Sequence, residues 1–151
     1  MDEDAPAASR DVAIRLLARR EHSTYELKLK LIQRGFDVDE IDSVLESLAA
    51  ENLLSDSRFA SEYSLSRRAR GFGPVRISAE LRERGVDPSL VEEALVPFAG
   101  DWVGEARLQR RKRFGAKPPG DWKHRARQIR FLTNRGFTVE QSRRAVDDIE
   151  P

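Results

Sequence analysis

Three short stretches decide the fold: Arg34-Gly35-Phe36, Arg84-Gly85-Val86 and Arg135-Gly136-Phe137. They are separated by 50 and then 51 residues, and a leucine stands four positions before each glycine. A hydrophobic residue also stands ten positions after each glycine. Self-similarity at a fixed period of this length is typical of tandem structural units.

Each of these glycines lies between the expected end of one helix and the start of the next. Ser23 and Glu26 have the spacing of a capping box before a leucine-rich segment, and Gly35 can take the left-handed conformation that ends a helix. Asp37 then provides a new helix start, and Thr138 with Gln141 repeats the capping-box spacing. A period near 50 residues leaves room for a third helix per unit, which we expect over 10–20, 56–70 and 101–114.

We therefore predict an all-α protein made of three tandem three-helix repeats in an elongated, curved array. High charge (35%) and few aromatic residues (7%) favour such an array over a barrel or sandwich. Each repeat is too small to bury a complete core alone. An irregular globule of nine helices is the alternative, and two prolines and two glycines make 114–121 an exposed loop. The expected boundaries are 1–9 for a disordered tail and 10–54, 55–99 and 100–151 for the repeats.

The sequence offers no catalytic, metal or cofactor site. There is no cysteine, and the two histidines, His22 and His124, are too far apart in sequence for a paired-histidine zinc motif. No glycine-rich phosphate loop or nucleophile elbow occurs, and His22 is interpreted as an exposed residue before a helix. An acidic N-terminal stretch and short apolar runs favour a soluble cytoplasmic location. We expect a protein that is not an enzyme and uses no cofactor.

The charge is unevenly distributed. Residues 1–50 carry a net −4, residues 51–100 a net −1 and residues 101–151 a net +6; between Arg107 and Arg135 stand 11 basic residues, mostly arginine, and the single acid Asp121. Such one-sided charge indicates a polyanionic partner, although a purely solvated face is the alternative. The candidate contacts in this basic segment are Arg107, Arg110, Arg111, Lys112, Arg113, Lys117, Lys123, Arg125, Arg127 and Arg130. A sparser second patch consists of Arg67, Arg68, Arg70 and Arg76.

Two tryptophans border the basic segment, Trp102 and Trp122. Either could stack on an unpaired base. Because both stand near the start of an expected helix in a chain with few large apolar residues, we predict that both pack in the core.

Several motifs recur in order along the chain: the leucine-rich segment 25–36, Leu54-Ser55-Asp56-Ser57-Arg58-Phe59-Ala60, Gly73-Pro74-Val75-Arg76-Ile77 and the leucine-rich segment 131–137. Both leucine-rich segments end in glycine and an aromatic residue. Together these motifs resemble the RecX family of bacterial recombination regulators. The resemblance spans about residues 10–149 and implies a protein that lies in the groove of a RecA–DNA filament. It further implies restraint of strand exchange, ATP hydrolysis and co-protease activity. We expect the partners to be the RecA filament and, weakly and without sequence preference, single- and double-stranded DNA, with the chain acting as a monomer.

A stand-alone DNA-binding protein is the rival hypothesis. Residues 23–34 and 38–51 have lengths suited to a helix-turn-helix. However, the candidate recognition helix carries Asp39, Glu40, Asp42 and Glu46, which DNA phosphates would repel.

Overall fold

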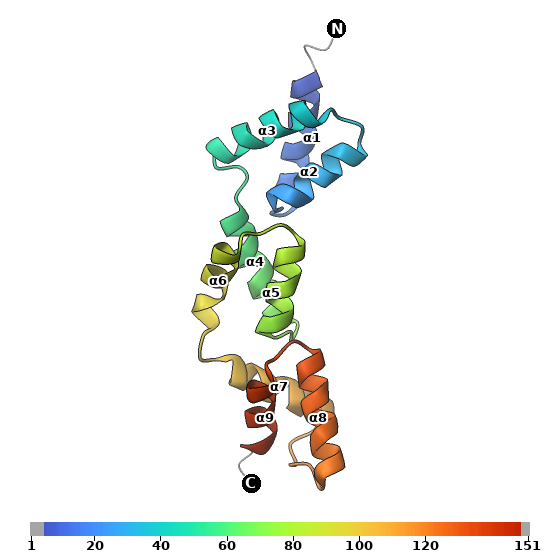
Figure 1. Cartoon of the computed structure of the whole chain (residues 1–151), viewed down its shortest axis with the longest axis vertical. Helices are drawn as coiled ribbons and strands as arrows, with labels where there is room; N and C mark the ends of the chain where they lie inside the picture. Colours follow the sequence, from blue (N-terminus) through green and yellow to red (C-terminus); the bar gives the residue numbers. More distant parts are fainter. Residues whose placement is uncertain (1–4, 149–151) are drawn as a thin grey trace. The chain divides into compact units, whose positions relative to one another are not determined.

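The computed structural model describes the backbone of residues 5–148 and the side chains of residues 8–148. The described backbone forms nine α-helices, one short 3₁₀ helix and no strand (Figure 1). The first repeat contains α1 (Ala5–Arg19), α2 (Thr24–Gln33) and α3 (Val38–Ala50). The second contains α4 (Asp56–Ala69), α5 (Pro74–Glu83), α6 (Pro88–Leu95) and the 3₁₀ helix η1 (Val96–Phe98). The third contains α7 (Trp102–Phe114), α8 (Trp122–Asn134) and α9 (Val139–Asp147). The predicted fold class of three three-helix repeats is confirmed over the described residues.

The first helix begins earlier than the sequence suggested. Residues 1–9 were expected to be a disordered tail, but α1 already starts at Ala5, and Ser9 is completely buried. A polar residue that loses its contact with water is held by tertiary packing, which the local composition of this acidic, alanine-rich stretch did not reveal. Residues 1–4 and 149–151 lie outside the described part of the chain.

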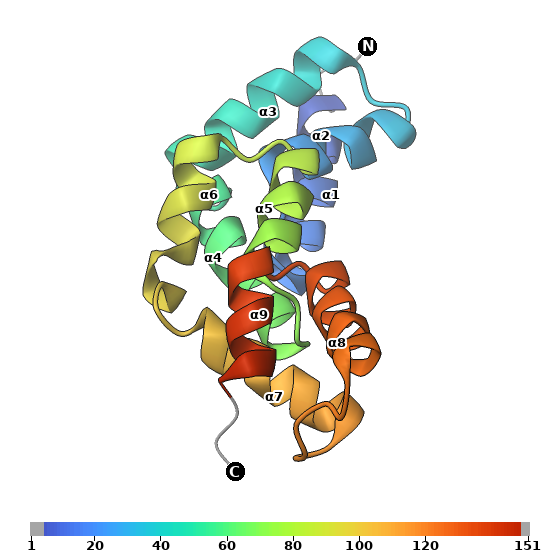
Figure 2. The ribbon, with the colours of Figure 1, turned by 60° about the horizontal axis from the view of Figure 1, so that its bottom comes forward.

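The chain divides into two compact units rather than three separate ones. The first unit comprises residues 1–62 and 81–91, and the second comprises 63–80 and 92–151, so the boundary passes through the second repeat. In the first unit, α1 packs on α2 and α3 around a leucine-rich core that includes Leu27, Leu31 and Leu48. In the second unit, α9 packs on both α7 and α8 (Figure 2). The Trp102 ring meets Phe137 edge-on, with 6.4 Å between the ring centroids.

The repeated glycines end helices and also lie in tight contacts. Gly35, Gly85 and Gly136 have φ angles of +89°, +77° and +100°, which L-residues rarely adopt. A Cβ added to Gly35 would meet nothing within 4 Å, whereas at Gly85 it would lie 2.6 Å from Tyr25 Cβ and at Gly136 2.3 Å from Arg76 Cβ. The glycine turns of the second and third repeats therefore dock against the start of the second helix in the preceding repeat.

Hydrogen bonds accompany both contacts. Within the first unit, the Ser23 hydroxyl donates to the Arg84 carbonyl at 2.7 Å. Within the second unit, the Gly73 amide donates to the Arg135 carbonyl at 2.9 Å and the Val75 amide to the Gly136 carbonyl at 2.8 Å. The same turn is thus used twice to join neighbouring repeats.

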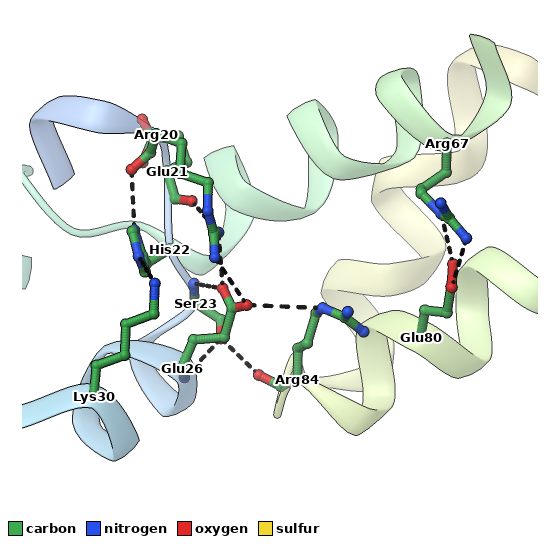
Figure 3. A network of polar contacts seen from close by, with 9 residues as sticks. All are labelled: Arg20, Glu21, His22, Ser23, Glu26, Lys30, Arg67, Glu80 and Arg84. Carbon is green, nitrogen blue, oxygen red and sulfur yellow. Dashed lines mark hydrogen bonds and ion pairs between the residues drawn. The ribbon is translucent and has the colours of Figure 1, made fainter. Parts of the chain in front are cut away.

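His22 lies inside a polar network at the first of these junctions (Figure 3). It was expected to be exposed, but only 1% of its surface is accessible. Its Nδ1 lies 3.1 Å from the Arg20 carbonyl oxygen and its Nε2 lies 2.8 Å from Lys30 Nζ. Since a carbonyl only accepts and an ammonium only donates, the ring carries its proton on Nδ1 and is neutral. Burial, together with the charges of Arg20 and Lys30, lowers the pKa of His22, against the opposing effect of the Arg20 carbonyl.

Candidate nucleic-acid interface

Eight of the cations predicted from sequence, all in the second unit, are exposed and without carboxylate partners, and they are here called the basic surface. In each of its members the side chain is exposed and forms no ion pair with any residue in 8–148. The members are Arg70, Arg111, Lys112, Arg113, Lys117, Lys123, Arg127 and Arg130. All eight belong to the sets predicted from sequence. An exposed cation without a carboxylate partner can meet a phosphate without first breaking an internal ion pair.

Three members of the basic surface form a row along α8, the α8 stripe: Lys123, Arg127 and Arg130. Residues three and four positions apart share a helix face, and a rise of about 1.5 Å per residue places their Cα atoms about 6 and 4.5 Å apart along the axis. Gln128 and Leu132 are buried on the core side of the same helix. A row of cations on an exposed face can follow successive phosphates of a nucleic-acid strand.

Arg111, Lys112 and Arg113 form the last turn of α7, and Lys117 lies in the loop that follows (Figure 2). Cations at a helix C-terminus are stabilised by the negative end of the helix dipole. This position explains locally how three adjacent positive charges are tolerated without a carboxylate. The three cations are therefore next to the α7–α8 loop. The predicted exposure of this loop is confirmed for residues 115–118 and 120–121.

Arg110 is not part of the exposed surface, contrary to expectation. Only 3% of its surface is accessible, because it lies four and eight residues after the buried Ala106 and Trp102 on one face of α7. Its Nε donates to Gln128 Oε1 at 2.8 Å, and its Nη atoms donate to the carbonyls of Gly115 and Lys117. Burial, with a smaller effect from Arg111, lowers the pKa of Arg110. Arg110 thus holds the α7–α8 loop in place.

Arg107 and Arg125 are engaged in ion pairs at the C-terminal end of α9. Arg125 forms a two-pronged contact with Asp147, with both N–O distances 2.7 Å. Arg107 lies 3.8 Å from Asp148, which also lies 3.7 Å from Arg144. The contact between Arg107 and Asp148 borders an open hollow of about 590 Å³ between α7 and α9. Both arginines stay partly exposed, but an external phosphate would compete with a carboxylate for them.

The second predicted patch is largely internal to the protein. Arg67 makes two hydrogen bonds to Glu80 (Figure 3), of 2.9 and 2.8 Å. Arg76 lies 3.7 Å from the same carboxylate. The guanidinium groups of Arg67 and Arg76 also lie over the ring of Phe72, at 3.9 and 4.3 Å from its centroid.

Arg68 also forms ion pairs within the protein, with Asp101 and with Glu105, the latter at 3.1 Å. Of the four residues in the second patch, only Arg70 remains exposed without an ion pair in the described residues. The four charges are visible in the sequence. The carboxylates that pair with Arg67 and Arg68 are brought close only by the fold. Arg76, in contrast, has Glu80 four positions later on the same helix.

The two tryptophans differ in their environment. Trp102 is 6% exposed and meets Phe98 and Phe137 edge-on, as predicted for a core residue. Trp122 is 74% exposed, so its predicted core position is wrong. It is the first residue of α8, whereas the buried residues of this helix, Gln128 and Leu132, lie in later turns.

The part of the chain that the structure describes contains neither a metal-binding cluster nor a membrane-spanning helix. No group of three or more histidine or acidic side chains is arranged to hold a metal ion within residues 8–148. Over the same part of the chain, none of the helices combines the length and apolar character needed to cross a bilayer.

Comparison with known proteins places these features in a family. Three family models match in order: "RecX, first three-helix domain" over residues 10–48, "RecX, second three-helix domain" over 55–95 and "RecX, third three-helix domain" over 105–146. The chain is 50% identical to "Regulatory protein RecX" of Halorhodospira halophila, over 93% of this chain and 88% of that protein. It is 47% identical to the protein of that name from Chromohalobacter salexigens, over 93% and 91%.

A solved structure supports the fold independently. The crystal structure of RecX from Lactobacillus salivarius superposes with a TM-score of 0.82 at 18% identity, covering 97% of each chain. With three domain models matched in sequence and relatives at up to 50% identity over most of its length, the chain belongs to the RecX family of regulatory proteins.

Proposed function

We propose that this protein is a non-enzymatic regulator that binds in the groove of a RecA–DNA filament and lowers its recombinase, ATPase and co-protease activities. Membership of the RecX family supports a regulatory role, because the relatives are named regulatory proteins. The basic surface is the observation that supports a filament on DNA as the target. A nucleoprotein filament displays phosphates along its length, and the exposed unpaired cations of the second unit match that chemistry.

The distribution of free and paired cations refines the expected contact. Arg110, Arg67 and Arg68 serve the fold, and Arg107, Arg125 and Arg76 face carboxylates. The basic surface therefore supplies the main electrostatic attraction to the filament. Charge steering of this kind speeds association and makes it sensitive to salt.

The test is RecA-catalysed ATP hydrolysis on single-stranded DNA, measured with increasing substoichiometric amounts of this protein. One variant reverses three charges of the basic surface: Arg111→Glu, Arg113→Glu and Arg127→Glu. A matched control reverses three exposed cations of the first unit that have no ion pair within the described residues: Arg15→Glu, Arg19→Glu and Arg34→Glu. Glutamate is a good helix former. Each variant places two of its three carboxylates at a helix C-terminus, so the unfavourable interaction with the helix dipole is matched and both should keep most of their helicity.

The wild-type protein and the control variant should inhibit hydrolysis, and the basic-surface variant should inhibit much less. Equal inhibition by all three proteins would remove the basic surface from the contact. No effect of the wild-type protein on the filament, combined with tight binding to bare DNA, would favour the stand-alone DNA-binding protein instead.

A further inference from the structure

Trp122 is the most exposed large hydrophobic side chain in residues 8–148. Its accessible fraction is 74%, whereas the other tryptophan, Trp102, is 6% exposed within the core. An indole left in water forgoes the stabilisation that its burial would bring. Trp102 is thus a core residue, whereas the exposed ring of Trp122 is available to an external ligand.

The backbone that carries Trp122 is fixed on both sides. Asp121 caps α8 by accepting a hydrogen bond from the His124 amide at 2.8 Å. Before it, Arg110 holds the loop through the carbonyls of Gly115 and Lys117. A side chain presented from an ordered backbone loses less entropy when it binds a ligand.

The surroundings of Trp122 favour a nucleic acid over a protein groove. Lys117, Lys123 and Arg127 are exposed and lack ion pairs within the described residues, and Lys123 Nζ lies 5.8 Å from the Trp122 ring centroid. Besides Trp122, segment 115–127 contains only alanine and proline as apolar residues. A protein-binding patch normally gathers several large apolar side chains, whereas cations around one aromatic platform are typical of single-strand binding sites.

We infer that Trp122 stacks on an unpaired base of single-stranded DNA whose phosphates follow the α8 stripe. The inference rests on the proposed function, since it specifies how the basic surface meets DNA. The stacking face is available only to bases that are not already stacked on both sides, so Trp122 favours single strands over duplexes. The α8 stripe binds the phosphates of single-stranded and of double-stranded DNA.

Intrinsic fluorescence tests the contact directly, because the chain has only two tryptophans. The probe is oligothymidylate of roughly 20 nucleotides, longer than a typical single-strand site. Titration at low salt should quench the wild-type emission, because a stacked base quenches an indole. The Trp122→Phe variant retains only the buried Trp102, and its emission should stay unchanged during the same titration.

Affinity gives a second readout. Trp122→Ala should bind oligothymidylate about 5- to 160-fold more weakly, while its affinity for a duplex of equal length stays the same. The slope of log affinity against log salt should not change, because no phosphate contact is lost. Val139→Ala, which truncates another exposed apolar residue of the third repeat, is the matched control and should bind like wild type.

The inference would be overturned by oligothymidylate binding without quenching of Trp122, or by equal affinity of Trp122→Ala and wild type. Failure to bind oligothymidylate at low salt would also overturn it. Measuring RecA ATPase inhibition by the same variants distinguishes a failure of the stacking inference from a failure of the proposed regulatory function. Suppose that Trp122→Ala loses inhibition although DNA does not quench Trp122 in the wild type. Trp122 then contacts the filament protein, so base stacking is wrong while the regulatory role stands.

Discussion

Replacing Gly136 by alanine should destabilise the protein more than replacing Gly35, although both glycines end the second helix of a repeat. Both have positive φ angles, +100° and +89°, so alanine at either site is strained by about 1–2 kcal/mol. Only at Gly136 would the new Cβ meet neighbouring backbone, with Arg76 N at 2.8 Å and Arg76 Cα at 3.1 Å. Overpacking of this kind adds about 1–3 kcal/mol. We expect a loss of about 1–2 kcal/mol for Gly35→Ala and about 2–5 kcal/mol for Gly136→Ala.

Urea unfolding followed by two probes measures this difference. Far-UV circular dichroism reports on helices of both units, and Trp102 fluorescence reports on the second unit because the ring lies against Phe137. A Trp122→Phe background makes Trp102 the single emitter. Gly136→Ala should shift the fluorescence transition, whereas Gly35→Ala should act mainly on the part of the dichroism signal that comes from the first unit.

Equal losses at the two positions would refute the reasoning. Such a result would mean that backbone conformation alone explains why glycine recurs at these turns, and that the turn at Gly136 is not closely docked. A larger loss at Gly35 would contradict the open space around it.

Three further changes test other parts of the structure. Replacing the α8 stripe by alanine should make the salt dependence of single-strand binding shallower by about 2 in log–log slope, since about 0.7 is lost per phosphate; alanine at Arg15, Arg19 and Arg34 should leave it unchanged. His22→Gln should remove an acid-dependent loss of stability. The pKa of His22 is lowered in the folded state, so as the pH decreases the unfolded chain takes up the proton first. The unfolding free energy of the wild type therefore decreases as the pH drops below about 6.5, the ordinary pKa of histidine. The refuting result is an unchanged pH dependence of urea unfolding in His22→Gln. Thr138→Ala should cost about 0.5–2 kcal/mol in the same assay, because the Thr138 side chain caps α9 through the Gln141 amide at 3.0 Å, whereas Thr138→Ser should cost much less.

Local signals made the helices predictable. The capping boxes at Ser23 and Thr138 are both present, and the three repeated glycines all take positive φ. These features depend on residues within a few positions of one another, so the sequence contains the information directly. The tertiary contacts between repeats were not accessible in this way.

The candidate site was predictable in charge but not in pairing. Arg67 is close to Glu80 only because α4 and α5 pack together. Arg68 reaches Asp101 and Glu105 only because α4 meets the start of α7, more than 30 residues later. The burial of Arg110 had a usable signal, since Trp102, Ala106 and Arg110 recur every four residues on one helix face. No such periodicity distinguishes Trp122, the first residue of α8.

Direct binding to the RecA–DNA filament tests the central claim, that the basic surface is the electrostatic contact. The measurement is the fluorescence anisotropy of labelled protein titrated with filament at low and at raised salt. It compares wild type with the two charge-matched variants, Arg111→Glu/Arg113→Glu/Arg127→Glu and Arg15→Glu/Arg19→Glu/Arg34→Glu. We predict that the first variant binds weakly and with little dependence on salt, while the second binds like wild type at both salt concentrations. Binding of the first variant as tight and as salt-sensitive as that of wild type would contradict the account.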